Sequence, residues 1–80
     1  MIHVLFFGPV ADHAGVHRVE VPFRTGMRWQ DVRDELRQRY EQAFERVCIA
    51  AVNGERVSDE EGESLADGDE IVFMSRFSGG

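Results

Sequence analysis

The chain has 80 residues, of which 42% are hydrophobic and 30% charged. That is enough for one small domain, because a chain of this size buries roughly 60% of the surface that its unfolded form exposes. Fifteen acidic and nine basic residues give a formal net charge of −6, which disfavours nucleic acid and anionic lipid as partners and favours a basic protein. So small a core leaves little room for an enclosed substrate pocket, so we expect a carrier, a binding module or a subunit.

The first two predicted elements are strands. The segment from Ile2 to Phe7 is β-branched and aromatic and stops at Gly8-Pro9, which indicates a strand. Its side chains alternate between two faces, with Ile2, Val4 and Phe6 on one and His3, Leu5 and Phe7 on the other. After a predicted loop that contains Gly15, the alternating sequence VHRVEV predicts a second strand, antiparallel to the first, which ends at Pro22.

The hydrophobic period then changes to that of a helix. Trp29, Val32, Leu36 and Tyr40 recur at spacings of three and four, which predicts an amphipathic helix from Trp29 to about Phe44. The residues between them are mostly charged and alternate in sign, as on a solvent-exposed, salt-bridged face. Arg28 occupies the expected cap position, where Ser, Thr, Asp or Asn is preferred, so the predicted start is fixed only to within a turn.

The second half of the chain predicts three further strands. CIAAV reads as a strand, and Asn53-Gly54 predicts a type I′ turn into a short strand near Arg56 to Ser58. An acidic loop follows, with Leu65 expected in the core beneath it. Asp67-Gly68-Asp69 is a predicted turn, and Glu70 to Met74 is the last strand, with Ile71 and Phe73 on one face and Val72 and Met74 on the other.

The first and last strands are apolar on both faces, which predicts that they lie side by side in the middle of the sheet. One face would pack on the helix. The other would leave an apolar patch, and a patch of that kind usually marks a protein partner; the alternative, that a loop covers it, stays open. The patch residues are Leu5, Phe7, Val72 and Met74.

Ordinary catalytic chemistry is hard to find in the sequence. There is no lysine, and Cys48 lies in the apolar stretch VCIAAV, where a buried, unreactive thiol is expected. His13 and His17 are four residues apart but fall in the predicted loop without a third ligand, so no metal site is expected. The chain has no signal-peptide pattern and no run approaching the ~20 apolar residues of a membrane span. We therefore expect a cytoplasmic protein without nucleic acid or membrane as a partner.

The C-terminal residues offer a different chemistry. We expect residues 1–75 to form the domain and residues 76–80 to extend from it by up to roughly 17 Å. Gly79 and Gly80 have no Cβ, so this tail can enter a channel too narrow for side chains. A terminal carboxylate with a pKa near ~3.5 is ionised and unreactive at neutral pH. A partner that adenylates it with ATP would make it an electrophile that sulfur or an amine can attack.

Three segments together resemble a known family. MIHVLFFGPVADHAG is similar to the first strand and loop of the small subunit of molybdopterin synthase, the MoaD family, and AAVNGERVS and LADGDEIVFMSRFSGG are similar to its third strand, hairpin and tail. The resemblance covers essentially the whole chain. It implies an α+β fold of the β-grasp, ubiquitin-like type, in which a mixed sheet of four to five strands packs on one main helix.

The same resemblance implies a non-catalytic sulfur carrier for molybdenum cofactor biosynthesis. A ubiquitin-activating-like adenylyltransferase would use ATP to adenylate Gly80, which then becomes a thiocarboxylate. The large subunit of molybdopterin synthase would take the tail and pass its sulfur to the molybdopterin dithiolene, while this chain itself binds no cofactor. Gly79 and Gly80 carry over as the functional residues. The residues implied to contact partners are Leu5, Phe7, Val72, Met74, Arg76, Phe77 and Ser78.

One difference from the family is visible, and other functions stay open. Members of the family commonly have Pro-Pro before the tail, where this chain has Ser75-Arg76, so its tail is less stiff and carries a positive charge. The alternatives are a sulfur carrier for thiamine, thiolated tRNA, cysteine or a tungsten cofactor, a ubiquitin-like modifier joined to lysines, and a plain protein-binding module.

Overall fold

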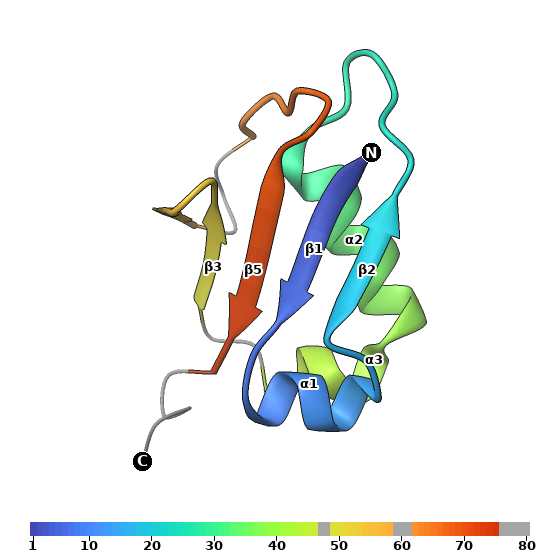
Figure 1. Ribbon diagram of the computed structural model, residues 1–80, viewed down its shortest axis with the longest axis vertical. Helices are drawn as coiled ribbons and strands as arrows, with labels where there is room; N and C mark the ends of the chain where they lie inside the picture. The colour runs from blue at the N-terminus through green and yellow to red at the C-terminus, as the bar shows by residue number, and fades with distance from the viewer. Residues whose placement is uncertain (47–48, 59–61, 76–80) are drawn as a thin grey trace.

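The computed structural model describes residues 1–46, 49–58 and 62–75, and its centre is a five-stranded mixed sheet (Figure 1). The order across the sheet is β2-β1-β5-β3-β4. The central pair, β1 and β5, is parallel, and the other neighbours are antiparallel. The predicted central position of the first and last strands is therefore confirmed. The strands are β1 (Ile2–Phe6), β2 (Arg18–Val21), β3 (Ile49–Val52), β4 (Glu55–Val57) and β5 (Glu70–Met74).

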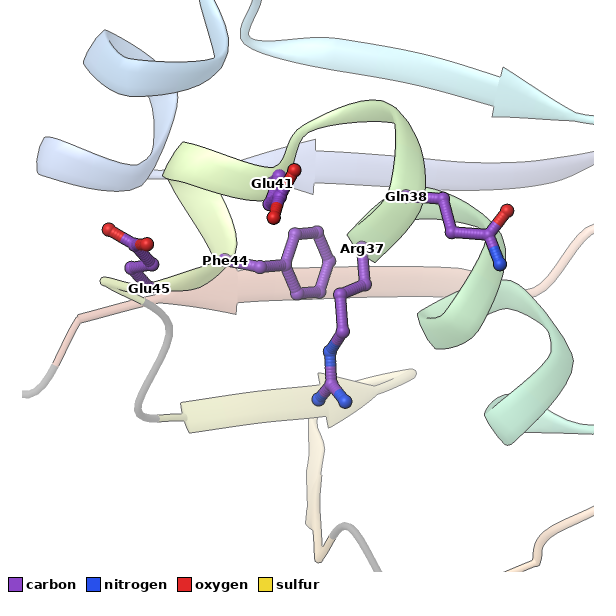
Figure 2. Close-up of a pocket in the computed structure, with 5 residues that line it drawn as sticks. All are labelled: Arg37, Gln38, Glu41, Phe44 and Glu45. Atoms are coloured by element: carbon purple, nitrogen blue, oxygen red, sulfur yellow. The ribbon is translucent and has the colours of Figure 1, made fainter.

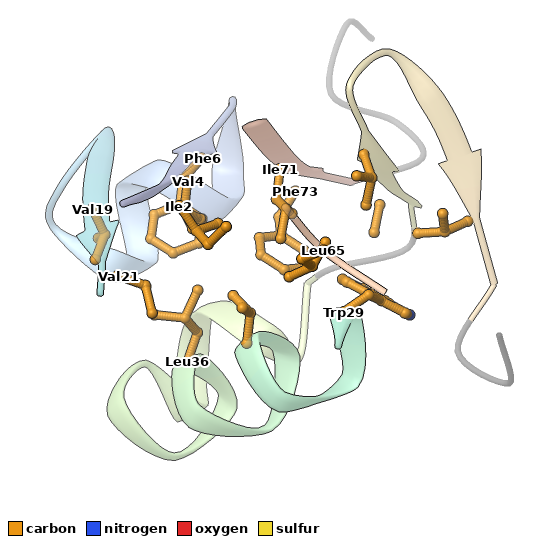
Figure 3. Packing of buried hydrophobic residues seen from close by; sticks show 14 of the residues in the cluster. Ile2, Val4, Phe6, Val19, Val21, Trp29, Leu36, Leu65, Ile71 and Phe73 are labelled. Carbon is orange, nitrogen blue, oxygen red and sulfur yellow. The ribbon is translucent and has the colours of Figure 1, made fainter. Parts of the chain in front are cut away.

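The core lies between the sheet and the helix α2 (Trp29–Arg39) (Figure 3). The alternation predicted for the two central strands is observed. The even-numbered apolar side chains of β1 and the odd-numbered ones of β5 point into the core. Phe73 of β5 is fully buried, and its ring centroid lies 5.7 Å from that of Trp29 and 5.9 Å from that of Phe6. Leu65 is also buried, as expected. Packing of this kind fixes the central strands from one side only.

The predicted loop after the first strand contains a helix, α1 (Pro9–Ala14), so that prediction was wrong. Pro9 occupies the start of the helix, where a missing N–H costs nothing, and Gly15 ends it with a left-handed φ of 78°. Val10 and Ala11 of this helix are buried in the core. Its length of six residues is too short to show a helical period in the sequence, whereas the proline–glycine spacing was a usable signal.

The predicted continuous helix to Phe44 is interrupted. Tyr40 has φ −127° and ψ 54°, and a second short helix, α3 (Glu41–Phe44), follows it. The interruption directs two aromatic rings at the core: the Tyr40 ring centroid lies 5.4 Å from that of Phe6, and that of Phe44 lies 4.9 Å from that of Phe73. These edge-to-face contacts between aromatic rings stabilise the break at Tyr40. Tertiary packing thus overrides the local helical pattern.

The start of α2 is where the sequence placed it. Arg28 is the N-cap residue, and its backbone N–H donates to the Asp31 carboxylate at 2.8 Å. The cap function comes from the third helical residue rather than from the cap side chain. The indole N–H of Trp29 donates to the Ser58 carbonyl at 3.2 Å, and the Leu65 N–H to the Met27 carbonyl at 2.9 Å. These bonds hold the connection before β5 against the helix.

The predicted Asn-Gly turn is confirmed. Asn53 and Gly54 have φ of 51° and 84° between β3 and β4. The Asn53 side chain also donates to the Asp69 carboxylate at 2.9 Å and accepts from the Glu70 N–H at 3.0 Å. The hairpin is therefore tied to the start of β5. In the described part of the chain, no helix is both long and apolar enough to cross a membrane.

Candidate functional site

The central strand β5 leads directly to the tail. It runs between β1 and β3, with Phe73 buried among aromatic rings next to its last residue, Met74. Phe7 donates its backbone N–H to the Phe73 carbonyl at 3.0 Å and so extends the pairing by one residue. The base of the tail is therefore held by two neighbouring strands and by the core.

Several predicted residues lie outside the part of the chain that the structure describes. They are the tail residues Arg76, Phe77, Ser78, Gly79 and Gly80, together with Cys48. Their predicted roles stay predictions.

The four predicted patch residues lie on one face of the sheet, opposite to the helices. Leu5 and Val72 are paired neighbours on β1 and β5 and are half-buried, as is Met74. Phe7 is 47% exposed, which is unusual for a phenylalanine. Figure 1 shows this face toward the viewer, with α2 and α3 behind the sheet. We call it the open face; its role in binding a partner stays a prediction.

The structure adds two residues that the sequence reading did not include. Ile49 and Ala51 of β3 are half-buried on the open face, where Ile49 pairs with Met74 and Ala51 with Val72. The alternation of IAAV, with Ala50 and Val52 buried, would have shown this once β3 was placed beside β5. The apolar surface therefore spans the three central strands.

One corner of the open face is polar. Glu20 of β2 binds Arg18, with Nε to Oε1 at 2.9 Å, and His3, with Nδ1 to Oε2 at 2.5 Å. Partial desolvation raises the pKa of Glu20, but the hydrogen bonds and charges of Arg18 and His3 outweigh it and hold this pKa below its usual value. The carboxylate is therefore kept ionised on this side of the sheet.

A second ion pair lies at the same end of the sheet. The N-terminal ammonium of Met1 contacts the Asp67 carboxylate, and this hydrogen bond and charge lower the pKa of Asp67. The Met1 carbonyl accepts from the Gly68 N–H at 3.0 Å. Both ion pairs lie where β1 and β5 begin, so the polar end of the sheet is opposite to the end where β5 leads into the tail.

A separate hollow lies on the helical side of the molecule (Figure 2). It has a volume of about 520 Å³, with the Phe44 ring at its centre and the side chain of Arg37 projecting beside it. The residues that line it are Arg37, Gln38, Glu41, Phe44 and Glu45. Among the lining residues that the structure describes there is no serine, cysteine or histidine, so these residues do not supply a nucleophile with a neighbouring base.

The two histidines noted for their spacing both lie at the C-terminal end of α1. His13 lies in the last turn of α1 and His17 beyond its end, both exposed. No group of three or more histidine, cysteine, aspartate or glutamate side chains suited to a metal occurs within residues 1–46, 49–58 and 62–75. The open face and the residue that leads into the tail are therefore the functional features that the geometry brings together.

A family model described as the ThiS family matches residues 4–80 of the chain. The match covers nearly all of the sequence and extends through the diglycine. No curated protein matches the chain.

Solved structures give the same picture. A Pyrococcus furiosus protein, provisionally named molybdopterin converting factor, subunit 1, is 30% identical, with a TM-score of 0.77 over 92% of this chain and 94% of that one. SAMP1 from Haloferax volcanii is 26% identical, with a TM-score of 0.81 over 99% and 98%. A structure of the small archaeal modifier protein 1 of H. volcanii is 25% identical, with a TM-score of 0.77 over 92% and 94%. The expected β-grasp fold is confirmed.

Proposed function

Because this chain belongs to the ThiS family of ubiquitin-like sulfur carriers, we propose that its C-terminal Gly80 carries sulfur for the molybdenum cofactor. The observation that carries the proposal is the family match itself, which continues to residue 80. The similarity to the P. furiosus protein, at 30% identity, favours the molybdopterin branch.

The carrier chemistry requires activation by a partner. The Gly80 carboxylate attacks the α-phosphate of ATP, pyrophosphate leaves, and an acyl-adenylate forms. The terminal sulfur of a donor persulfide then attacks the carbonyl carbon and AMP leaves, which forms an acyl disulfide. A thiol cleaves the S–S bond of this intermediate, which releases the thiocarboxylate and joins the thiol to the donor sulfur as a new disulfide. The activating enzyme supplies ATP and the catalytic groups. This chain supplies the acyl group and the surface that positions it.

The two parts of the chain have separate tasks in this proposal. The open face, with Phe7 and Met74 near the start of the tail, binds first the activating enzyme and then the large subunit of molybdopterin synthase. The tail enters each active site, where Gly79 and Gly80 offer backbone without side chains. The buried Phe73 holds the point from which the tail starts, so that docking of the face determines where Gly80 can reach.

A second function is favoured by a specific observation. SAMP1 from H. volcanii, a protein whose name in a related structure is small archaeal modifier protein 1, aligns with 99% of this chain at a TM-score of 0.81. In a modifier the same acyl-adenylate is attacked, directly or through a thioester, by a lysine amine of a target protein. The two functions share activation and differ in the final nucleophile.

The activation step is tested with purified protein whose mass shows that Gly80 is its last residue. The chain is incubated with a ubiquitin-activating-like adenylyltransferase, and exchange of radiolabelled pyrophosphate into ATP is measured. We expect exchange that depends on this chain and is lost when Gly79 and Gly80 are deleted. The control Arg24→Ala, at an exposed position between β2 and α2, keeps both glycines and should retain most of the exchange.

Exchange that is unaffected by the deletion would contradict the proposal, because activation would then not occur at Gly80. The choice between carrier and modifier is made in cell extracts. Peptides with a glycine remnant of this chain on target lysines would favour the modifier.

A further inference from the structure

The rows of the sheet show how charges are arranged on the open face. Read across the five strands through the paired residues, one row is Arg18, Leu5, Val72, Ala51 and Arg56. Its three central residues are apolar and half-buried, and both ends, on the edge strands, are exposed arginines. With about 4.8 Å between neighbouring strands, the two arginine Cα atoms are roughly 19 Å apart. A basic border thus encloses the apolar centre on two sides.

The rows on either side differ from this one and from each other. The row toward the start of β5 pairs Glu20 with His3 and His3 with Glu70, and it is mainly acidic. The row toward the tail pairs Met74 with Ile49, next to Phe7, and is apolar. The open face therefore has a direction: acidic where β5 begins, bordered by arginine in the middle, and apolar where the tail begins.

The two arginines are not equivalent. Arg18 is held along β2 by Glu20, with Nε to Oε1 at 2.9 Å, and its Nη2 lies 3.3 Å from Nδ1 of His3. Within the described residues, the Arg56 side chain makes no ion pair or hydrogen bond. Arg56 is thus an available cation at the border of an apolar surface, in a chain whose net charge is −6.

We propose that the partner of the open face is a protein surface with an apolar centre and a carboxylate placed opposite Arg56. This inference rests on the proposed function, since it takes that partner to be the activating enzyme. The charge order selects one docking direction. A partner rotated by half a turn would place its carboxylate at Arg18, the other end of the same row. The guanidinium of Arg18 is already paired with Glu20 at 2.9 Å, so the incoming carboxylate would meet a neutralised cation and the like charge of Glu20, which disfavours binding. In the selected direction the tail leaves at the apolar end of the interface.

A second copy of this chain is a poorer occupant of the open face. Two chains of net charge −6 repel each other at long range. A partner with a basic surface beyond the interface is attracted at long range by the net negative charge of this chain. An acidic group on that partner opposite Arg56 forms the local ion pair. Sedimentation of the isolated chain is expected to show a monomer, and a dimer that Arg56→Glu dissociates would overturn the proposed occupant.

The test measures the dissociation constant for the purified activating enzyme without ATP. Arg56→Glu is compared with Arg24→Glu, which changes the net charge equally at an exposed position between β2 and α2. We expect Arg56→Glu to weaken binding by about 10-fold or more and Arg24→Glu by less than about 2-fold. Arg56→Gln should give an intermediate loss. Thermal unfolding of each variant checks that the fold is retained.

The second arm reverses the charge on the enzyme. Changing the carboxylate that crosslinking places nearest residue 56 to arginine should restore binding of Arg56→Glu while weakening that of the wild type. Equal losses for Arg56→Glu and Arg24→Glu, or no restoration, would overturn the inference. Binding that depends on Arg56 without any ATP–pyrophosphate exchange would contradict the proposed function and leave this inference standing. ATP–pyrophosphate exchange that is insensitive to Arg56→Glu would overturn this inference and leave the proposed function standing.

Discussion

At the scale of single residues, adjacent side chains have opposite roles. Phe6 is 1% exposed and contacts the rings of Tyr40, Phe44 and Phe73, whereas Phe7 is 47% exposed. Strand alternation explains the difference, because successive side chains point to opposite sides of the sheet. The sequence was sufficient to predict these two directions. It could not show that Phe7 would be left without cover from a loop, since that depends on where α1 is placed.

This difference gives a pair of variants with opposite effects. Phe6→Ala should lower the free energy of unfolding by about 3–5 kcal/mol, because it leaves a cavity in the aromatic core. Phe7→Asp should change it by less than about 1 kcal/mol while weakening binding to the activating enzyme. Chemical denaturation and a binding titration measure the two quantities. A loss of stability for Phe7→Asp comparable to that of Phe6→Ala would show that Phe7 belongs to the core.

The ion pairs predict a dependence of stability on pH. Glu20 and Asp67 have lowered pKa values in the folded chain, from usual values of 4.5 and 3.8. Their contribution to stability is therefore complete above these values and is lost as the pH falls through the lower folded values. In denaturation between about pH 5 and pH 2, Glu20→Gln should lose less stability on acidification than the wild type. If the stability of Glu20→Gln depended on pH as that of the wild type does, the ion pairs of Glu20 would not be formed in solution.

At the scale of elements, short-range packing decides what the sequence pattern leaves open. The strand β5 was predicted with its observed ends, because a short continuous apolar run follows a predicted turn. The break at Tyr40 was missed because the helical spacing continues through it. Only the neighbouring rings of Phe6 and Phe73 show why the chain turns there. Similarly, the apolar surface contributed by β3 follows from its place beside β5, which local periodicity does not give.

The start of α2 predicts a cost for losing its cap. Asp31→Ala removes the carboxylate that accepts a hydrogen bond from the Arg28 N–H. The negative charge of this carboxylate also interacts favourably with the positive end of the helix dipole. We expect a loss of about 1 kcal/mol in the free energy of unfolding. Asp34→Ala is the matched control in the same helix, because within the described residues the Asp34 carboxylate has its hydrogen bond and ion pair only with the neighbouring Arg33. Equal losses for the two variants would contradict a capping role for Asp31.

The contact between the β3–β4 hairpin and the start of β5 predicts the effect of swapping the side chains of Asn53 and Asp69. Asn53→Asp places a second carboxylate against Asp69, whose Oδ1 lies 2.9 Å from the Asn53 amide nitrogen, and should lower stability at neutral pH by about 1–3 kcal/mol. Adding Asp69→Asn restores a donor and an acceptor and should recover part of the loss. The difference should shrink near pH 3, where carboxylates begin to take up protons. Without such recovery, the link between hairpin and β5 would not be important for stability.

At the scale of the whole molecule, the fold buries one face of the central strands against the helices and leaves the other face open. The sequence predicted the central strand pair, the main helix and the apolar open face, because these follow from periodicity and from two-sided strands. It did not predict the arginine border of that face. Arg18 and Arg56 are 38 positions apart in the sequence and become parts of one row only through four strand pairings. Charge patterns across a sheet therefore require its topology.

The most direct test of the account is the intact mass of the chain after coexpression with the activating enzyme and a source of reduced sulfur. We expect a species in which one oxygen of the terminal carboxylate is replaced by sulfur, with fragmentation placing the change at Gly80. The variant that lacks Gly79 and Gly80 should keep its unmodified mass. A mass that never changes under conditions in which the enzyme converts its own known carrier would contradict the claim that Gly80 carries sulfur.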